Sequence, residues 1–203
     1  MLASSSIIQD IEAISKYGLA SLAFFYCDYN EEQKCELPGL VSSLLVQLCH
    51  QSDSYCDILS NFYLKHSRGS KHPRGDALVG CLKDILSLPA QAPVYIILDA
   101  LDECRITSTP SPREDVMMLV EDLIDSRISN LFICVTSRPE VDIKAVLDPL
   151  TFRSISLHDQ TGQMEDIDNY IRSVVSTDPI MRRWNTADKQ LVIDVLTNRA
   201  DSM

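Results

Sequence analysis

The 203-residue sequence predicts an α/β fold, a three-layer sandwich in which helices cover both faces of a parallel β-sheet. Short apolar runs alternate with helical patterns along most of the chain, which is the order that parallel strands and their crossover helices require. The apolar runs have no polar face, as is typical of strands covered by helices on both sides. With 45% hydrophobic residues, the chain can bury one complete core and begin a second domain.

The first elements follow directly from residue spacing. The isoleucines of the first helix are spaced at helical intervals, at Ile7, Ile8, Ile11 and Ile14. Residues 22–27 are apolar and include three aromatic side chains, which predicts a buried strand. From Leu37 to Leu48 apolar residues repeat at three and four positions, which predicts an amphipathic helix.

The middle of the chain repeats this order. Two helical patterns cover residues 55–63 and 78–85, and they are separated by a loop at residues 68–75 that contains glycine and proline. A buried strand at residues 94–98 then ends in three carboxylates, those of Asp99, Asp102 and Glu103. This strand with its acidic end is the most informative segment of the sequence.

The last part of the chain contains one strong strand and three helices. A helix is expected at residues 116–124, and the apolar run at residues 131–135 is a strand that ends before Arg138 and a proline. A weaker strand is expected at residues 153–157. Helices at 164–175 and 191–196 follow, so the predicted domains are residues 1–160 and an incomplete second domain at residues 161–203.

Composition excludes several classes of partner. The chain has 29 Asp and Glu against 18 Lys and Arg, a net charge of -11 that opposes binding to nucleic acid and to anionic membrane surfaces. Its seven cysteines are an odd number without zinc-ligand spacing, which favours reduced thiols. No apolar run is long enough to cross a bilayer, and Asp10 and Glu12 do not fit a signal peptide. We therefore expect a cytoplasmic protein.

Candidate functional residues follow two of the predicted strands. Ligands of open parallel sheets bind at the carboxyl ends of the strands. There Asp99 could hold Mg²⁺, Asp102 or Glu103 could polarise a water, and Arg138 could neutralise charge on a phosphate. The alternative is an acidic turn that solubilises the strand end, beside an arginine that forms a surface ion pair.

Two motifs at these strand ends resemble those of a known family. Ile97–Cys104 resembles the extended Walker B motif of NACHT NTPases, a group of STAND P-loop NTPases, and Val135–Glu140 resembles their sensor 1 strand. Leu22–Tyr29, followed by the Leu37–Leu48 helix, is similar to the region after the P-loop in the nephrocystin 3-like N-terminal type found in fungal NACHT repeat proteins. Residues 166–171 and 200–203 are also similar, with Ser202 in place of a glycine.

The resemblance implies a P-loop NTPase-like fold and assigns roles to the candidate residues. Asp99 would be the Mg²⁺-associated Walker B acid, Asp102 and Glu103 would activate water, and Arg138 would sense the terminal phosphate of ATP or GTP. Such domains act as nucleotide-controlled switches and oligomerisation platforms in signal transduction. They are commonly followed by ankyrin, WD40 or tetratricopeptide repeats, so the implied partners are proteins or further copies. Residues 161–203 would begin a helical or winged-helix-side subdomain.

The sequence lacks the phosphate-binding loop of that family. A P-loop (Walker A) requires G-x-x-x-x-G-K followed by Ser or Thr, and the one G-x-x-x-x-G here, Gly75–Gly80, lies within a helical pattern. In the family the loop precedes the helix that here begins at Leu2, so the first strand and its loop are expected to be missing. We therefore expect little or no binding of Mg²⁺ and ATP, no ATPase activity of the chain alone, and association through unpaired strand edges.

Two other interpretations remain open. A catalytically silent interaction module could recognise a partner through its acidic surface and the Leu37–Leu48 stripe, although core packing explains that stripe more simply. An unrelated enzyme could use a histidine as its base, but no recognisable motif joins a nucleophile to any of His50, His66, His72 or His158.

Overall fold

The chain folds into two compact units. The structure, a computed structural model, describes residues 2–28, 36–66, 73–106, 110–156 and 163–200. The N-terminal unit is Met1–Thr151 and the C-terminal unit is Phe152–Met203, so the division lies somewhat before residue 160. The candidate residues all belong to the N-terminal unit.

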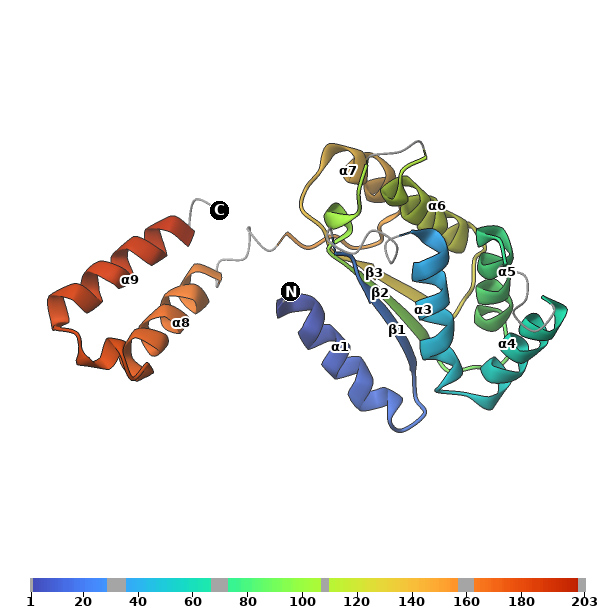
Figure 1. Ribbon diagram of the computed structural model, residues 1–203, viewed down its shortest axis with the longest axis horizontal. Helices are drawn as coiled ribbons and strands as arrows, with labels where there is room; N and C mark the ends of the chain where they lie inside the picture. The colour runs from blue at the N-terminus through green and yellow to red at the C-terminus, as the bar shows by residue number, and fades with distance from the viewer. Residues whose placement is uncertain (1, 29–35, 67–72, 107–109, 157–162, 201–203) are drawn as a thin grey trace. The chain divides into compact units, whose positions relative to one another are not determined.

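A three-stranded parallel sheet forms the centre of the N-terminal unit (Figure 1). Its strands are β1 (Ser21–Tyr26), β2 (Val94–Asp99) and β3 (Leu131–Val135), in the spatial order β1-β2-β3. Val94 pairs with Ser21 on one side and with Leu131 on the other, so the strands run in register from their first residues. The three strong apolar runs are confirmed as parallel strands, and their carboxyl ends share one rim of the sheet.

Helices cover both faces of this sheet, which confirms the three-layer arrangement. On one face, Ile8 and Ile11 of α1 (Leu2–Ser15) pack against Leu22 and Ile97. The other face is buried in a larger core to which the helices between β1 and β2, the helix between β2 and β3, and the first helix after β3 contribute. These helices are α3 (Leu37–Cys49), α4 (Asp53–Lys65), α5 (Gly75–Leu86), α6 (Pro112–Asp125) and α7 (Val141–Leu147).

The apolar stripe of α3 is part of this core. Its five leucine and valine side chains are at most 1% exposed: Leu40, Val41, Leu44, Leu45 and Leu48. Because the stripe is covered, it cannot serve as the recognition surface of an interaction module, and core packing is confirmed. Gly75 and Gly80 both lie within α5, so the G-x-x-x-x-G sequence is helical, as expected.

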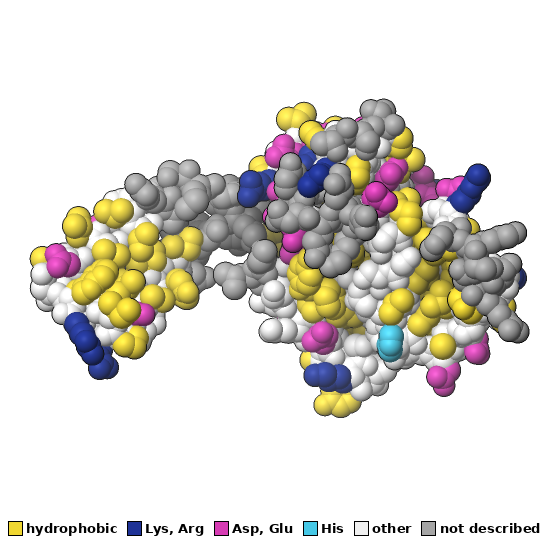
Figure 2. All heavy atoms as spheres, in the orientation of Figure 1, with side chains coloured by type: hydrophobic (Ala, Val, Ile, Leu, Met, Phe, Trp, Pro, Cys, Tyr) yellow, Lys and Arg dark blue, Asp and Glu magenta, His cyan; other side chains and the backbone are white. Residues whose placement is uncertain are grey.

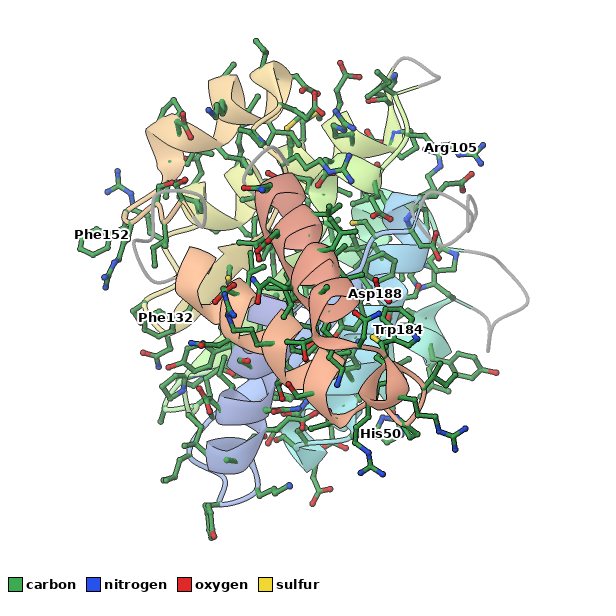
Figure 3. The ribbon with its side chains drawn as sticks, turned by 90° about the vertical axis from the view of Figure 1, so that its left-hand side faces the viewer. His50, Arg105, Phe132, Phe152, Trp184 and Asp188 are labelled. Carbon is green, nitrogen blue, oxygen red and sulfur yellow. The ribbon has the colours of Figure 1, made fainter. Side chains whose placement is uncertain are left out.

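Strand β3 lies at an edge of the sheet and is less covered than its neighbours. Within the described residues it pairs only with β2. Phe132 is 50% exposed, stacks on Tyr95 with ring centroids 5.1 Å apart, and lies near the margin of the view in Figure 3. The strand contains no charged residue and no proline, the features that usually protect an edge from pairing with other strands.

The prediction of a weak strand at residues 153–157 was wrong for the part that the structure describes. Residues 153–156 form no strand and are exposed, and residue 157 lies outside the described ranges. Phe152, just before them, is fully exposed and projects away from the ribbon in Figure 3. A strand requires a hydrogen-bonded neighbour, and these residues have none among the described segments, so alternating apolar residues alone did not produce one.

The C-terminal unit is built on two helices, as the sequence predicted. They are α8 (Gln163–Thr177) and α9 (Thr186–Ala200), and the Thr197 hydroxyl donates to Asp168 at 3.2 Å between them. Hydrophobic side chains gather on the face of this unit seen in Figure 2. Its large exposed apolar side chains include Tyr170 on α8, Ile180 and Trp184 between the two helices, and Leu191, Val195 and Leu196 on α9. The pattern at 200–203 lies mostly outside the described residues.

None of the helices in the described ranges combines the length and the apolarity needed to cross a bilayer.

The open edge of β3 predicts concentration-dependent self-association of the chain. Phe132→Lys places a charge beside this edge, and a charge there opposes pairing with a strand of another chain. Sedimentation velocity should therefore show a larger monomer fraction for this variant than for the wild-type chain. Tyr17→Lys is the matched control, because Tyr17 is 82% exposed and lies outside the sheet. A wild-type chain that stays monomeric at all concentrations and melts sharply and reversibly in calorimetry would contradict this expectation.

Candidate functional site

The carboxyl ends of β2 and β3 are joined by a hydrogen-bonded pair, Asp99 and Thr136. Asp99 is 3% exposed, and its Oδ1 accepts a hydrogen bond from Thr136 Oγ1 at 2.5 Å. The amide of Ala100 donates to the same hydroxyl oxygen at 3.0 Å. A buried carboxylate is costly unless it is paired, so Thr136 stabilises the position that Asp99 occupies at the rim.

A tight turn carries the other two acids away from β2. Ala100 has φ 57°, in the left-handed region, and leads into the single 3₁₀ turn η2 (Leu101–Glu103). This conformation costs a residue other than glycine about 1–2 kcal/mol. The amide hydrogen bond of Ala100 and the complete burial of Leu101 offset that cost. The turn therefore fixes the backbone of Asp102 and Glu103.

Asp102 contacts Arg138, the residue expected to sense a phosphate. Its Oδ1 accepts a hydrogen bond from the Arg138 amide at 3.0 Å, and its Oδ2 lies 3.4 Å from Arg138 Nε. The side chain of Asp102 is 10% exposed and that of Arg138 is 80% exposed. The Asp102 carboxylate thus connects the turn after β2 to the segment after β3, and the guanidinium remains largely in solvent.

Glu103 is the acid with the least occupied carboxylate. It is partly exposed, and within the described residues its carboxylate forms no hydrogen bond or ion pair. All four sequence-predicted residues, Asp99, Asp102, Glu103 and Arg138, therefore lie at one rim of the sheet: Asp99 ends β2, Asp102 and Glu103 form the turn after it, and Arg138 follows β3. The structure brings together what the sequence placed at two separate strand ends.

The donor set at this rim fits a metal ion only in part. Among the described residues no three His, Cys, Asp or Glu side chains are arranged to hold a metal. Asp99 directs one oxygen to Thr136, and in the described ranges no donor is directed at the other oxygen. Mg²⁺ is commonly held by one or two carboxylates together with waters and phosphate oxygens, which is the contribution that Asp99 could make.

Sequence reasoning missed one charged residue near the site, Arg113. It follows Pro112 in the first turn of α6 and is 8% exposed. Its Nε donates to Cys104 O at 3.2 Å, a terminal nitrogen donates to Asp102 O, and the other lies 3.1 Å from Asp142 Oδ2. The sequence Ser-Pro-Arg-Glu indicates a capping box, which the structure contains, but it does not indicate that the arginine is buried.

The ion pair with Arg113 changes the acidity of Asp142. Partial burial raises the pKa of Asp142, but the hydrogen bond from Arg113 and other hydrogen bonds outweigh it, so the pKa lies below its usual value. Asp142 therefore remains ionised at neutral pH and keeps its attraction for the guanidinium.

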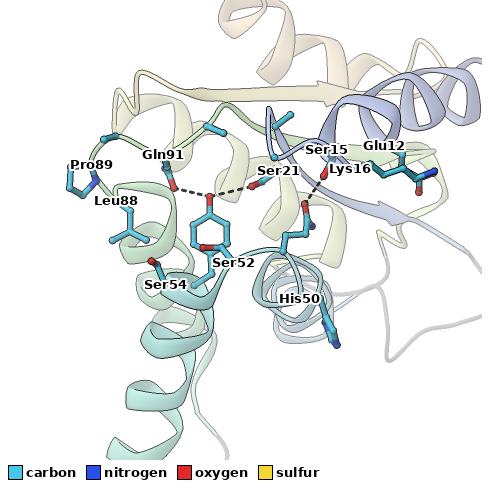
Figure 4. Close-up of a pocket in the computed structure, with 16 residues that line it drawn as sticks. Glu12, Ser15, Lys16, Ser21, His50, Ser52, Ser54, Leu88, Pro89 and Gln91 are labelled. Carbon is cyan, nitrogen blue, oxygen red and sulfur yellow. Dashed lines mark hydrogen bonds between the residues drawn. The ribbon is translucent and has the colours of Figure 1, made fainter.

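A cleft of about 940 Å³ lies at the opposite end of the strands from this rim (Figure 4). Its polar groups pair with one another. Tyr55 Oη donates to Gln91 Oε1 at 3.0 Å and lies 3.3 Å from Ser21 Oγ, and Gln51 Nε2 donates to Leu22 O at 2.6 Å. This network ties β1 to α4, to Gln51 just before α4, and to Gln91 just before β2. Among the described residues, no buried side-chain nitrogen or oxygen atom lacks a hydrogen bond.

Three of the described cysteines, Cys49, Cys81 and Cys134, are poorly suited to nucleophilic chemistry because their thiol pKa values are raised. All six in the described residues are free thiols, and Cys35 lies outside those residues. Burial, with a smaller contribution from Cys56, raises the pKa of Cys49 to about 11. Burial, with a smaller contribution from Asp84, raises the pKa of Cys81 to about 11. Burial also raises the pKa of Cys134, and Asp99 adds to the shift.

These pKa values predict the order in which the thiols react. In a Cys35→Ser background, Ellman's reagent at pH 8 should label the exposed Cys56 first. Cys49 and Cys81 should react slowly, because a pKa of about 11 leaves roughly one thiolate in a thousand at pH 8, and faster as the pH rises toward 11. Cys56→Ser should remove the fast phase. A fast phase that survives this substitution would contradict the expected order.

Comparison with known protein families gives a match over most of the N-terminal unit. The family model described as Nephrocystin 3, N-terminal matches residues 1–138. This match extends from α1 to Arg138, includes all four residues of the rim, and covers more than half of the chain. No curated protein and no solved structure matches the chain. The chain therefore belongs to the nephrocystin 3 N-terminal family.

Proposed function

We propose that this chain is part of a NACHT-type signalling NTPase, a nucleotide-controlled switch and oligomerisation module of the cytoplasm. One observation carries the proposal. A buried carboxylate at the end of β2, an acidic turn after it and an arginine after β3 lie at one rim of a parallel sheet, where such folds bind ligands. Membership of the nephrocystin 3 N-terminal family supports the same function.

Each residue of the rim has a role in this proposal. Asp99 would associate with the Mg²⁺ of a bound nucleotide through its carboxylate oxygen. Glu103 would orient the attacking water, because its carboxylate is not engaged within the described residues, whereas that of Asp102 is occupied by Arg138. Arg138 would contact the terminal phosphate, for which its exposed guanidinium is accessible. Mg²⁺ would polarise the phosphate oxygens.

The 203 residues lack the loop that supplies most phosphate contacts in such a site. Backbone amides of a P-loop surround the phosphates, and its lysine and hydroxyl complete the site. We therefore propose that the chain alone does not hydrolyse ATP and that its partners are proteins, including further copies of itself. Nucleic acid and membrane are poor partners, since the net charge is -11.

A catalytically silent interaction module is the second candidate function. The uncharged edge of β3 and the exposed apolar side chains of α8 and α9 favour it, because such surfaces commonly bind proteins. A nucleotide-binding experiment separates the two functions.

Titration calorimetry with Mg²⁺-ATP should detect no micromolar binding to the chain as it is. An extended chain, in which a strand and a Gly-Lys-Ser loop precede Met1, should bind, because the phosphate contacts are restored. Asp99→Asn in the extended chain should weaken binding, whereas Asp84→Asn, at an exposed site on α5, should not.

The rate of ATP hydrolysis by the extended chain shows which acid, Glu103 or Asp102, orients the attacking water. Glu103→Gln should slow it about a hundredfold or more if Glu103 orients the water, and Asp102→Asn should act less strongly. Failure of the extended chain to bind Mg²⁺-ATP would refute the nucleotide switch and favour the silent module. Micromolar binding by the unextended chain would refute the dependence on a P-loop.

A further inference from the structure

Arg113 occupies a position that is electrostatically unfavourable by itself. It lies in the first turn of α6, where the helix dipole favours negative charge, and it is 8% exposed. A buried cation is costly unless its partners replace the lost water. Glu114 and Asp115 of the same turn suit the dipole, but the guanidinium is compensated by groups outside α6.

Those groups belong to two other segments. The carbonyl oxygens of Asp102 and Cys104 accept hydrogen bonds from Arg113 on one side, and the Asp142 carboxylate forms an ion pair with it on the other. The three acceptors each take a different nitrogen of the planar guanidinium, whereas a lysine presents its three donors from a single nitrogen. We call this set of contacts the Arg113 bridge.

The Arg113 bridge is a second link between segments that Asp102 and Arg138 already join. Asp102 takes part in both links: its carboxylate accepts a hydrogen bond from the Arg138 amide, and its carbonyl oxygen accepts one from the Arg113 guanidinium. Asp142, in the first turn of α7, follows shortly after Arg138 in sequence. The turn after β2 and the segment from Arg138 into α7 are thereby fixed to each other at two points.

We propose that Arg113 is a positioning residue that couples α7 to the acidic turn, so that the rim is arranged before any ligand binds. It acts through Asp102 and contacts none of the groups expected to touch a ligand. The consequence for regulation rests on the proposed function: a nucleotide that orders Glu103 and Arg138 would also order α7, and a partner that displaces α7 would loosen the acidic turn.

Asp142→Ala tests the coupling at a residue that does not contact the turn. Asp142 is 47% exposed, so its removal leaves the core intact. Hydrogen exchange followed by NMR should become about tenfold faster at the amides of Glu103 and Cys104, because an unpaired Arg113 holds their turn less firmly. The amide signal of Arg138 should shift, and exchange at Ile96 in β2 should not change.

Three further variants complete the experiment. Asp142→Asn keeps a hydrogen-bond acceptor and should restore part of the protection. Asp122→Ala, the matched control for Asp142→Ala, removes the 2.6 Å pair between Lys83 and Asp122 of α6, and it should leave exchange at Glu103 and Cys104 unchanged. Arg113→Lys retains the charge but not the planar set of donors. It should therefore speed exchange at Glu103 and Cys104 at least as much as Asp142→Ala does.

The coupling is overturned if Asp142→Ala changes exchange only within α7, or if Asp122→Ala loosens the turn as much. Arg113→Met with Asp142→Ala should loosen the turn no more than Arg113→Met alone, and additive effects would also overturn the coupling. If the Arg113 variants do not fold, the Asp142 variants still decide. None of these measurements uses nucleotide, so a failure of ATP binding and a failure of the coupling are separate results.

Discussion

The hydrogen bond between Thr136 and Asp99 is the interaction on which the candidate site depends. It joins the ends of two neighbouring parallel strands and satisfies a carboxylate that is 3% exposed. The same hydroxyl oxygen accepts a hydrogen bond from the amide of Ala100. Ala100 has a left-handed backbone and begins the turn that positions Asp102 and Glu103. Without this pair, the strand end would carry a buried charge without a partner, and the acids that follow it would lose their fixed positions.

The sequence predicts the fold well because the spacing of apolar residues along the chain determines which segments become strands or helices and which side chains are buried. Continuous apolar runs become the three strands, and the stripe from Leu40 to Leu48 is core because a helix with that spacing has one apolar face. The segment at residues 153–156 fails because a strand depends on a neighbour that residue spacing cannot reveal. The acids and Arg138 were predictable because strand ends of a parallel sheet share a rim. Burial of Arg113 was not, because it depends on carbonyls brought together by folding.

The site lies beside the least covered part of the sheet. The core formed by α3, α5 and α6 buries the face of the sheet opposite α1. Strand β3, by contrast, has an open edge and a half-exposed Phe132. The rim therefore gains order from polar contacts more than from apolar packing, through Thr136, the pair of Asp102 with Arg138, and the Arg113 bridge. Elements held in this way open more easily than a packed core, as segments that respond to ligands must.

The most direct test of the nucleotide-site account uses a paramagnetic ion in place of Mg²⁺. Mn²⁺-ATP added to the ¹⁵N-labelled extended chain, in which a strand and a Gly-Lys-Ser loop precede Met1, broadens the NMR signals of amides near the metal. The account predicts selective broadening of Ala100, Glu103 and Arg138, with Gln51 and Gln91 in the opposite cleft unaffected. Broadening centred on that cleft, or no selective broadening at the rim, would contradict it.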